Sequence, residues 1–117
     1  MFDLDFKKHD YLLPVVLQDA DNDAVLMVGF MNREALAKTI ETGCATFLSR
    51  TRQRLWTKGE TSGSFAVVDS ITTDCDRDAL LLRVRVRGDG NICHNRTRSC
   101  FTEVLEVPVL EPTAARP

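Results

Sequence analysis

The sequence predicts a mainly β fold of the α+β type, one compact β domain with one or two short helices. Short runs rich in valine, leucine and isoleucine recur along the chain between clusters of turn-forming residues. Only one segment carries the start and stop signals of a helix. The chain has 117 residues, 44% hydrophobic and 27% charged, as in an ordinary single globular domain. We expect residues 1–108 to form this domain and residues 109–117, which have no pattern, to be a flexible tail.

The first element expected is a β-hairpin over residues 14–31, in which two apolar runs flank a turn. Three aspartates alternate in that turn, namely Asp19, Asp21 and Asp23. They do not form an EF-hand loop, because Ala24 stands where that loop requires glycine. We interpret all three as solvated turn residues.

A helix is expected over residues 32–43. Asn32 is a favourable N-cap, and Gly43 suits the C-terminal stop. Leu36 and Ile40 lie one turn apart and are expected on a single face.

Further strands are expected over residues 44–50, 64–73, 80–87 and 100–109. Residues 80–87 alternate most clearly, with leucine and valine on one side and three arginines on the other. We interpret the arginine side as a surface that faces solvent or a partner. A polar loop, bounded by glycines, is expected over residues 59–63.

The bulk properties favour a cytoplasmic protein that binds neither membranes nor nucleic acid. The net charge is -2, which gives no general attraction to polyanions. The first residues do not resemble a signal peptide, and the apolar run at residues 24–31 is too short to span a bilayer. Cysteines stay reduced in the cytoplasm, so the four cysteines favour metal binding or chemistry over disulfides.

Three of these cysteines are candidate zinc ligands, namely Cys75, Cys93 and Cys100. Their spacing is not that of a structural zinc ribbon, but three thiols are the right number for a catalytic zinc with one open position. His94 is either a fourth ligand or a general base. Cys44 fits a small buried apolar residue better.

Three aspartates surround the first of these cysteines, namely Asp74, Asp76 and Asp78. In an extended segment they would project to one side and Cys75 to the other. Carboxylates at this spacing repel each other unless a cation neutralises them, and Mg²⁺ is a natural candidate. An exposed acidic turn is the alternative.

Basic residues alternate earlier in the chain, at Arg50, Arg52 and Arg54, and Trp56 and Lys58 follow. Guanidinium groups suit phosphate oxygens, and an indole can stack on a base. A solvated strand face is the alternative interpretation.

Four stretches, in order, resemble a known enzyme family: LMVGFMNREAL, SRTRQRLWTKGETSG, DCDRDALLL and CHNRTRSCF. Together they cover roughly residues 10 to 107. The combination is similar to phosphoribosyl-AMP cyclohydrolase, the hydrolase of histidine biosynthesis that opens an adenine ring. The resemblance implies a small nucleotide substrate, 1-(5-phosphoribosyl)-AMP, hydrolysed at its N1–C6 bond. It also implies an intertwined homodimer with a zinc site shared between the chains.

The same resemblance implies roles for individual residues. Zinc would be held by Cys75, Cys93 and Cys100, and magnesium by Asp74, Asp76 and Asp78. His94 would be the catalytic base. Substrate would be bound by Arg50, Arg52, Arg54, Trp56, Lys58, Glu60, Thr61 and Ser62. One position departs from the family, which usually has glycine where this chain has Arg96.

A different class of function is a zinc-stabilised module that binds nucleic acid or protein through its arginines. A structural zinc is four-coordinate and closed, so this reading needs His94 as a ligand and leaves the aspartates without a role. A zinc nucleobase deaminase is disfavoured, because its H-x-E and P-C-x-x-C signature is missing.

Overall fold

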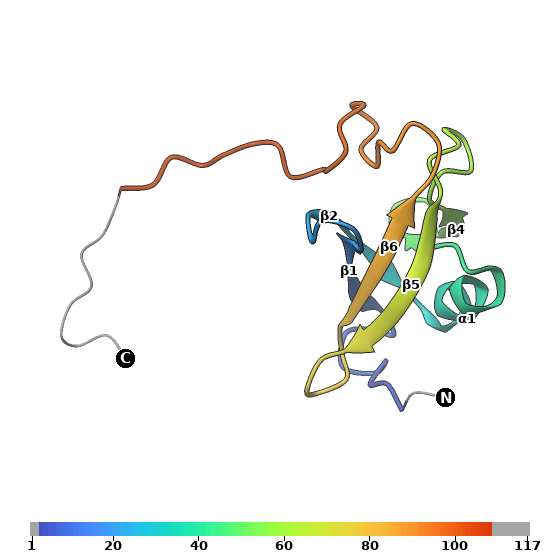
Figure 1. Ribbon diagram of the computed structural model, residues 1–117. Coiled ribbons are helices and arrows are strands. Elements are labelled where there is room, and N and C mark those ends of the chain that lie inside the picture. Colours follow the sequence, from blue (N-terminus) through green and yellow to red (C-terminus); the bar gives the residue numbers. More distant parts are fainter. Residues whose placement is uncertain (1–2, 109–117) are drawn as a thin grey trace.

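The computed structural model describes residues 3–108, and in them the chain is mainly β, as predicted (Figure 1). The elements, in order, are β1 (Leu13–Asp19), β2 (Val25–Met31), α1 (Arg33–Thr42), β3 (Thr46–Ser49), β4 (Arg54–Thr57), β5 (Ala66–Thr73) and β6 (Leu80–Val86). No helix in the described part of the chain is long and apolar enough to cross a membrane.

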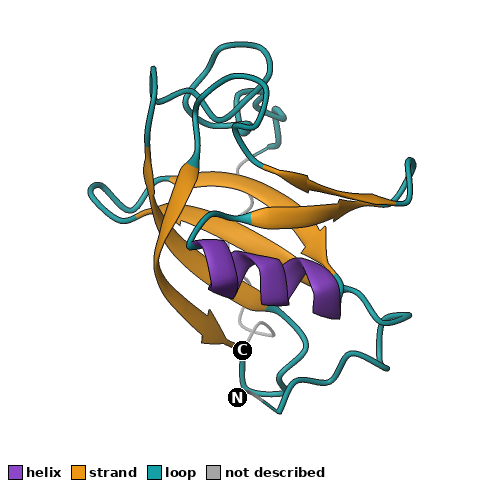
Figure 2. Cartoon of the chain, turned by 90° about the vertical axis from the view of Figure 1, so that its right-hand side faces the viewer, coloured by secondary structure: helices purple, strands orange, loops and turns teal. Residues whose placement is uncertain are grey.

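The strands form two sheets. The larger sheet has the order β2-β1-β6-β5, and β3 and β4 form a separate antiparallel pair. The predicted hairpin is confirmed, since β1 and β2 pair antiparallel. The hairpin of β5 and β6 joins it through a parallel pairing of β1 with β6. The helix lies in front of the larger sheet in Figure 2 and contacts β2 and β3.

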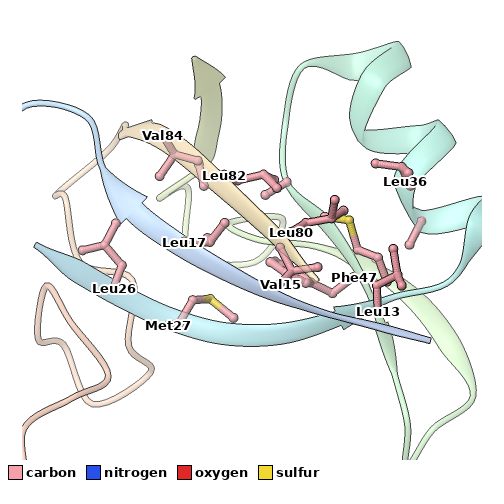
Figure 3. Packing of buried hydrophobic residues seen from close by; sticks show 14 of the residues in the cluster. Leu13, Val15, Leu17, Leu26, Met27, Leu36, Phe47, Leu80, Leu82 and Val84 are labelled. Atoms are coloured by element: carbon pink, nitrogen blue, oxygen red, sulfur yellow. The ribbon is translucent and has the colours of Figure 1, made fainter. Parts of the chain in front are cut away.

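The core forms on the face of the larger sheet that α1 and β3 cover (Figure 3). Alternate residues of the two central strands are buried there, because successive side chains of a strand point to opposite faces. They are Leu13, Val15 and Leu17 on β1, and Leu80, Leu82 and Val84 on β6. Phe47 from β3 completes this core and is fully buried. Its ring lies against Gly29, where an added Cβ would be only 2.6 Å from the ring.

The helix begins and ends where the sequence predicts. The Asn32 side chain accepts a hydrogen bond from the Ala35 N–H at 2.8 Å, and Gly43 ends the helix with a left-handed φ of 76°. Its buried face differs from the expected one, because Leu36 is buried while Ile40 is 43% exposed. Thr39 takes the inner position instead, and its hydroxyl accepts a hydrogen bond from the Thr46 N–H at 3.0 Å. This link to β3 sets the rotation of the helix.

The strand expected over residues 100–109 is wrong for the part that the structure describes. Residues 101–108 have no strand structure and lead away from the domain (Figure 1). A strand needs a neighbour for its backbone hydrogen bonds, and among residues 3–108 this segment pairs with no strand. Its apolar side chains are consequently exposed, namely Phe101, Val104, Leu105 and Val107. Residue 109 and the tail expected over 109–117 lie outside the described residues.

Candidate functional site

An open pocket of about 790 Å³ lies beside β4 and the segment that follows β6. Of the substrate-binding residues that the sequence predicts, the structure brings seven to its wall, namely Arg52, Arg54, Trp56, Lys58, Glu60, Thr61 and Ser62. Cys93 and His94 line it as well, so the basic motif and the cysteine motif meet at one place. A volume of this size is in the usual range for a small-molecule site.

Strand β4 positions the aromatic and basic part of the wall, so the strand named as the alternative interpretation is present over residues 54–57. Trp56 is paired with Phe47 across the β3–β4 hairpin, and the two ring centroids lie 5.2 Å apart. The indole is therefore held on the core. The Lys58 ammonium lies 5.5 Å from the centroid of the Trp56 ring, which places a cation beside an aromatic face.

The predicted loop at residues 59–63 forms a compact turn. The Gly63 N–H donates to the Gly59 carbonyl at 2.7 Å. Gly59 has a φ of 93°, and an added Cβ would lie 2.5 Å from the backbone of Ser64 and Phe65. Only glycine fits here, and the turn presents Glu60, Thr61 and Ser62 to the pocket.

Arg50 lies elsewhere. Its guanidinium carbon is 3.9 Å from the centroid of the Phe30 ring, and the residue is not part of the pocket wall. The three arginines that alternate in sequence are thus divided, because a turn at residues 50–53 intervenes before β4 begins. The substrate-binding role predicted for Arg50 therefore has no support from the pocket of a single chain.

The pocket wall carries more positive than negative charge. Its four cationic side chains are Arg52, Arg54, Lys58 and Arg96, and its two acidic ones are Glu60 and Asp89. Such a surface attracts phosphate groups.

Sequence reasoning missed Asp89, although the turn that contains it, GDGN, directly precedes the Cys93 motif. The hydroxyl of the buried residue Ser64 donates to the Asp89 carboxylate at 2.6 Å, and the Asn91 N–H donates at 3.0 Å. These hydrogen bonds, that of Ser64 first, lower the pKa of Asp89. The carboxylate joins the turn after β6 to the loop at 59–63.

Cys93 and Cys100 lie at the two ends of one turn, near enough for each thiol to influence the pKa of the other. The Cys93 N–H donates to the Thr97 carbonyl at 3.0 Å, and the Cys100 N–H donates to the Leu26 carbonyl on β2 at 2.7 Å. The Asn95 backbone N–H, followed by the Thr97 hydroxyl, lowers the pKa of Cys93. Burial raises the pKa of Cys100, and the neighbouring Cys93 adds to that effect. Two thiols near enough to influence each other's pKa suit a soft metal ion.

Cys75 does not join these two cysteines within one chain. It lies in the turn between β5 and β6, at the opposite end of β6 from the Cys93 turn (Figure 1). The seven residues of β6 separate the two ends by about 20 Å. A group of at least three Cys, His, Asp or Glu side chains could hold a metal ion if their ligand atoms all lie within 4.8 Å of one another. Among residues 3–108 there is one such group, and it consists of three aspartates.

Those aspartates are Asp74, Asp76 and Asp78, the predicted trio. They converge for a different reason from the one expected, because residues 74–79 form the β5–β6 turn and not an extended strand. Arg77 has a left-handed φ of 61°, which breaks the alternation of the segment. The Asp74 carboxylate accepts hydrogen bonds from the N–H groups of Asp78 and Ala79 at 3.0 and 3.2 Å. The turn itself therefore gathers the carboxylates.

Two side chains from the N-terminal segment contact this trio. The Lys8 ammonium lies 2.8 Å from an Asp76 oxygen and 3.1 Å from an Asp78 oxygen. His9 Nε2 lies 3.0 Å from the same Asp78 oxygen. Lys8, above all, keeps the pKa of Asp78 well below its usual range. A cation thus already sits among these oxygens, and their hard donor set suits a divalent metal ion.

The turn at Asp19, Asp21 and Asp23 corrects another expectation, that all three aspartates are solvated. Asp21 and Asp23 are exposed, but Asp19 has no exposed surface. It ends the buried face of β1, whose alternation carries its side chain inward, and there Arg98 binds it at 2.8 Å. The arginine face of β6 agrees with the prediction of a polar surface, as Arg83 and Arg85 lie within ion-pair distance of Asp23 and Asp21.

Arg96 keeps the backbone shape that a glycine would favour. Its φ is 63°, in the left-handed region, and it closes the turn by donating its N–H to the Cys93 carbonyl at 3.0 Å. Arginine thus adopts, in this chain, a backbone conformation that glycine also adopts readily.

Comparison with known proteins identifies the family of the chain. The family model for phosphoribosyl-AMP cyclohydrolase matches residues 27–102, which include all of the cysteines and pocket residues described above. The chain is 53% identical over 103 residues to the phosphoribosyl-AMP cyclohydrolase of Solibacter usitatus, covering 88% of this chain and 81% of the relative. It is 57% identical over 99 residues to a histidine biosynthesis bifunctional protein of Escherichia coli, covering 85% of this chain and 48% of the relative. The chain thus spans about half the length of that bifunctional relative and most of the single-function one. The chain belongs to the phosphoribosyl-AMP cyclohydrolase family.

Proposed function

We propose that this protein hydrolyses the N1–C6 bond of the adenine ring in 1-(5-phosphoribosyl)-AMP, a step in histidine biosynthesis. One observation carries the proposal beyond family membership. A pocket wall with four cationic side chains and an indole also includes Cys93, whose thiol is near enough to Cys100 for the two to influence each other's pKa. That combination offers phosphate binding, base stacking and a soft metal site in one place.

The pocket residues have complementary roles in this proposal. Arg52, Arg54 and Lys58 would bind the phosphates of the two phosphoribosyl groups. Trp56, held on Phe47, would stack on the purine. The turn with Glu60, Thr61 and Ser62 would contact a ribose or phosphate oxygen.

Hydrolysis adds one water across the N1–C6 bond. The oxygen joins C6, which becomes the carbon of a carboxamide, and N1 receives a proton and stays on the second ribose. His94, which is exposed beside Cys93 on the pocket wall, is the proposed base that removes a proton from the attacking water.

We propose that zinc is bound by Cys93 and Cys100 of one chain and Cys75 of a second chain in a homodimer. Bound zinc supplies a water of lowered pKa. Two facts support a shared site. Cys75 lies at the far end of β6 from the other two cysteines, and residues 101–108 expose apolar side chains that a second chain would cover.

We further propose that Asp74, Asp76 and Asp78 bind magnesium, which supplies a hard cation for a phosphate oxygen. The convergence of their oxygens within 4.8 Å supports this assignment. The proposal places the enzyme in the cytoplasm, where the cysteines stay reduced for metal binding.

Ring opening of 1-(5-phosphoribosyl)-AMP, followed by absorbance, tests the proposal. We expect activity that a zinc chelator removes and added zinc restores. Cys93→Ala should abolish both activity and zinc content. Cys44→Ala is the matched control, because Cys44 lies outside the pocket wall, and it should retain both. A Cys93→Ala variant with wild-type turnover would contradict the zinc assignment.

The shared site has its own test. Cys75→Ala and Cys93→Ala chains, each inactive alone, would be unfolded together in equal amounts and refolded. Random pairing makes half of the dimers mixed, and each mixed dimer has one intact site of two. The mixture should therefore recover about a quarter of the wild-type activity. No recovery from a mixture that folds and dimerises would contradict ligands from two chains.

A further inference from the structure

We propose that the ion pair between Asp19 and Arg98 is a positioning device that holds Cys93 and Cys100 in their metal-binding arrangement. The inference rests on the proposed zinc assignment of these two cysteines. The inference gives a role to the Asp19 carboxylate, which is 79 residues from Arg98 in the sequence. Neither residue lines the pocket, so the proposed action is on the cysteines and not on the substrate.

The pair has the geometry of a specific contact. Arg98 Nε and Nη2 both donate to the same Asp19 carboxylate oxygen, at 3.1 and 2.8 Å. Nη1 donates to the Gly90 carbonyl at 3.3 Å. A Cβ at Gly90 would lie 2.6 Å from that nitrogen, so the absence of a side chain there makes room for the guanidinium. All three nitrogens of the Arg98 guanidinium thus donate a hydrogen bond.

Asp19 is a fixed anchor. It is the last residue of β1, where it pairs with Val84 of β6 in the centre of the larger sheet. Its second carboxylate oxygen accepts the Asp21 N–H at 2.8 Å. Its side chain is fully buried, and in the described part of the chain Arg98 is the one cationic group within ion-pair distance of it. A buried carboxylate with a single cationic partner depends strongly on that partner.

Arg98 lies in the segment between Cys93 and Cys100, next to the hydrogen bonds that hold each of them. Its carbonyl accepts the Ile92 N–H at 3.2 Å, next to the Cys93 N–H that donates to the Thr97 carbonyl. On its other side the Ser99 hydroxyl donates to the Val25 carbonyl at 2.7 Å, and the Cys100 N–H donates to the Leu26 carbonyl. The Arg98 backbone thus lies between the hydrogen bonds that hold Cys93 and those that hold Cys100, and its side chain ties this segment to Asp19 and to the Gly90 carbonyl.

A metal site tolerates little displacement of its ligands, about 0.2 Å from ideal distances. Without this ion pair, the Cys93–Cys100 turn would keep its backbone hydrogen bond to β2 but lose the hydrogen bonds and the ion pair that join it to β1 in the described part of the chain. Residues that support metal ligands in this way typically change metal affinity by 10- to 100-fold when replaced.

The test compares zinc affinity, measured by competition with a chromophoric chelator, in the wild type and three variants. Asp19→Asn removes the charge and keeps the shape, and Arg98→Lys keeps the charge and removes the fork. Asp23→Asn is the matched control, because Asp23 lies in the same turn and forms a 2.8 Å ion pair with Arg83, away from the cysteines. Thermal unfolding and the absorption spectrum of the Co²⁺ complex are recorded for each.

We expect Asp19→Asn and Arg98→Lys to bind zinc at least tenfold more weakly, with an altered Co²⁺ spectrum, and Asp23→Asn to stay within twofold of wild type. If Asp19→Asn does not fold, Arg98→Lys decides the question by the same criteria. Folded variants with lower thermal stability but wild-type zinc affinity and Co²⁺ spectrum would overturn the inference, because the pair would then be structural only. A wild-type chain without tight zinc binding would instead overturn the zinc assignment, so the two failures are distinguishable.

Discussion

The ammonium of Lys8 lies 2.8 Å from the carboxylate of Asp76, so a side chain of the protein occupies the region where the proposed magnesium would bind. The same ammonium contacts Asp78, and these carboxylates raise the pKa of Lys8, with Asp76 the larger influence. The ion must displace Lys8 before all three carboxylates can bind it.

Replacement of Lys8 by methionine should therefore strengthen Mg²⁺ binding. Solvent and salt screen an exposed ion pair, so we expect a modest gain in affinity of roughly a few-fold. Isothermal titration calorimetry with Mg²⁺ measures it. Lys7→Met is the control and should change little, because Lys7 is exposed and forms no ion pair in the described part of the chain. Weaker or equal binding by Lys8→Met would show that Lys8 does not compete with the ion.

Arg52 and Arg50 offer a matched pair for substrate binding. Arg52 lies on the pocket wall, whereas the Arg50 guanidinium stacks on Phe30 outside it. A charge-assisted hydrogen bond to phosphate contributes about 1.5–3 kcal/mol, so Arg52→Ala should raise KM by about tenfold or more. Arg50→Ala should leave KM within about twofold. Steady-state kinetics with 1-(5-phosphoribosyl)-AMP measures both values of KM. A larger increase in KM for Arg50→Ala than for Arg52→Ala would contradict these roles.

Gly29 should be intolerant of any side chain. An added Cβ would lie 2.6 Å from the buried ring of Phe47, and overpacking of a core typically costs about 1–3 kcal/mol. Gly29→Ala should lower the free energy of unfolding in urea by that amount. Val28→Ala, on the exposed face of the same strand, should change it by less than about 1 kcal/mol. Equal effects of the two would mean that Phe47 can move aside.

The left-handed backbone at Arg96 predicts that a glycine variant is more stable than a valine variant. Arg96→Gly should leave the free energy of unfolding unchanged or slightly higher, because glycine adopts a φ of 63° without strain. Arg96→Val should lower it by about 1–2 kcal/mol, because a β-branched residue is disfavoured there. Urea unfolding of the two variants compares them directly, and a valine variant as stable as the glycine one would contradict the assigned turn.

Acid stability should depend on Asp19. Burial alone would raise its pKa, but the Asp21 N–H and the Arg98 guanidinium outweigh burial and hold the pKa below its ordinary value. A lowered folded-state pKa means that the unfolded chain binds the proton more readily. The contribution to stability is then complete above an unfolded pKa of roughly 4 and disappears as the pH falls through the folded pKa. Between pH 5 and pH 2, Asp19→Asn should therefore lose less stability than the wild type. An unchanged loss in urea titrations would contradict the lowered pKa.

Sequence patterns identified the elements whose signals are local. The N-cap of Asn32 and the alternation of β6 each depend on neighbouring residues, and both are as predicted. The segment at 100–109 failed because a strand also needs a partner, which no local pattern supplies. The rotation of α1 toward Thr39 depends on a hydrogen bond to Thr46 and could not be read from helical spacing.

In the candidate site, too, some features were predictable from local sequence and others depend on the fold. Residue type and order predicted many of the side chains on the pocket wall, such as Arg52 and His94, but they also included Arg50, which lies elsewhere, and omitted Asp89. The aspartate trio was anticipated as a group, but its turn was not, because the left-handed φ of Arg77 leaves little trace in sequence. The contact of Asp19 with Arg98 joins residues far apart in the chain, and for that reason only the folded structure reveals it.

Turnover in water enriched in ¹⁸O tests the central claim most directly. Hydrolysis at C6 predicts that product formed by the purified zinc-loaded protein carries one labelled oxygen, located in the carboxamide by fragment mass spectrometry. Unchanged substrate, or a product that keeps the six-membered ring closed and has lost the exocyclic amine, would contradict the proposed ring opening.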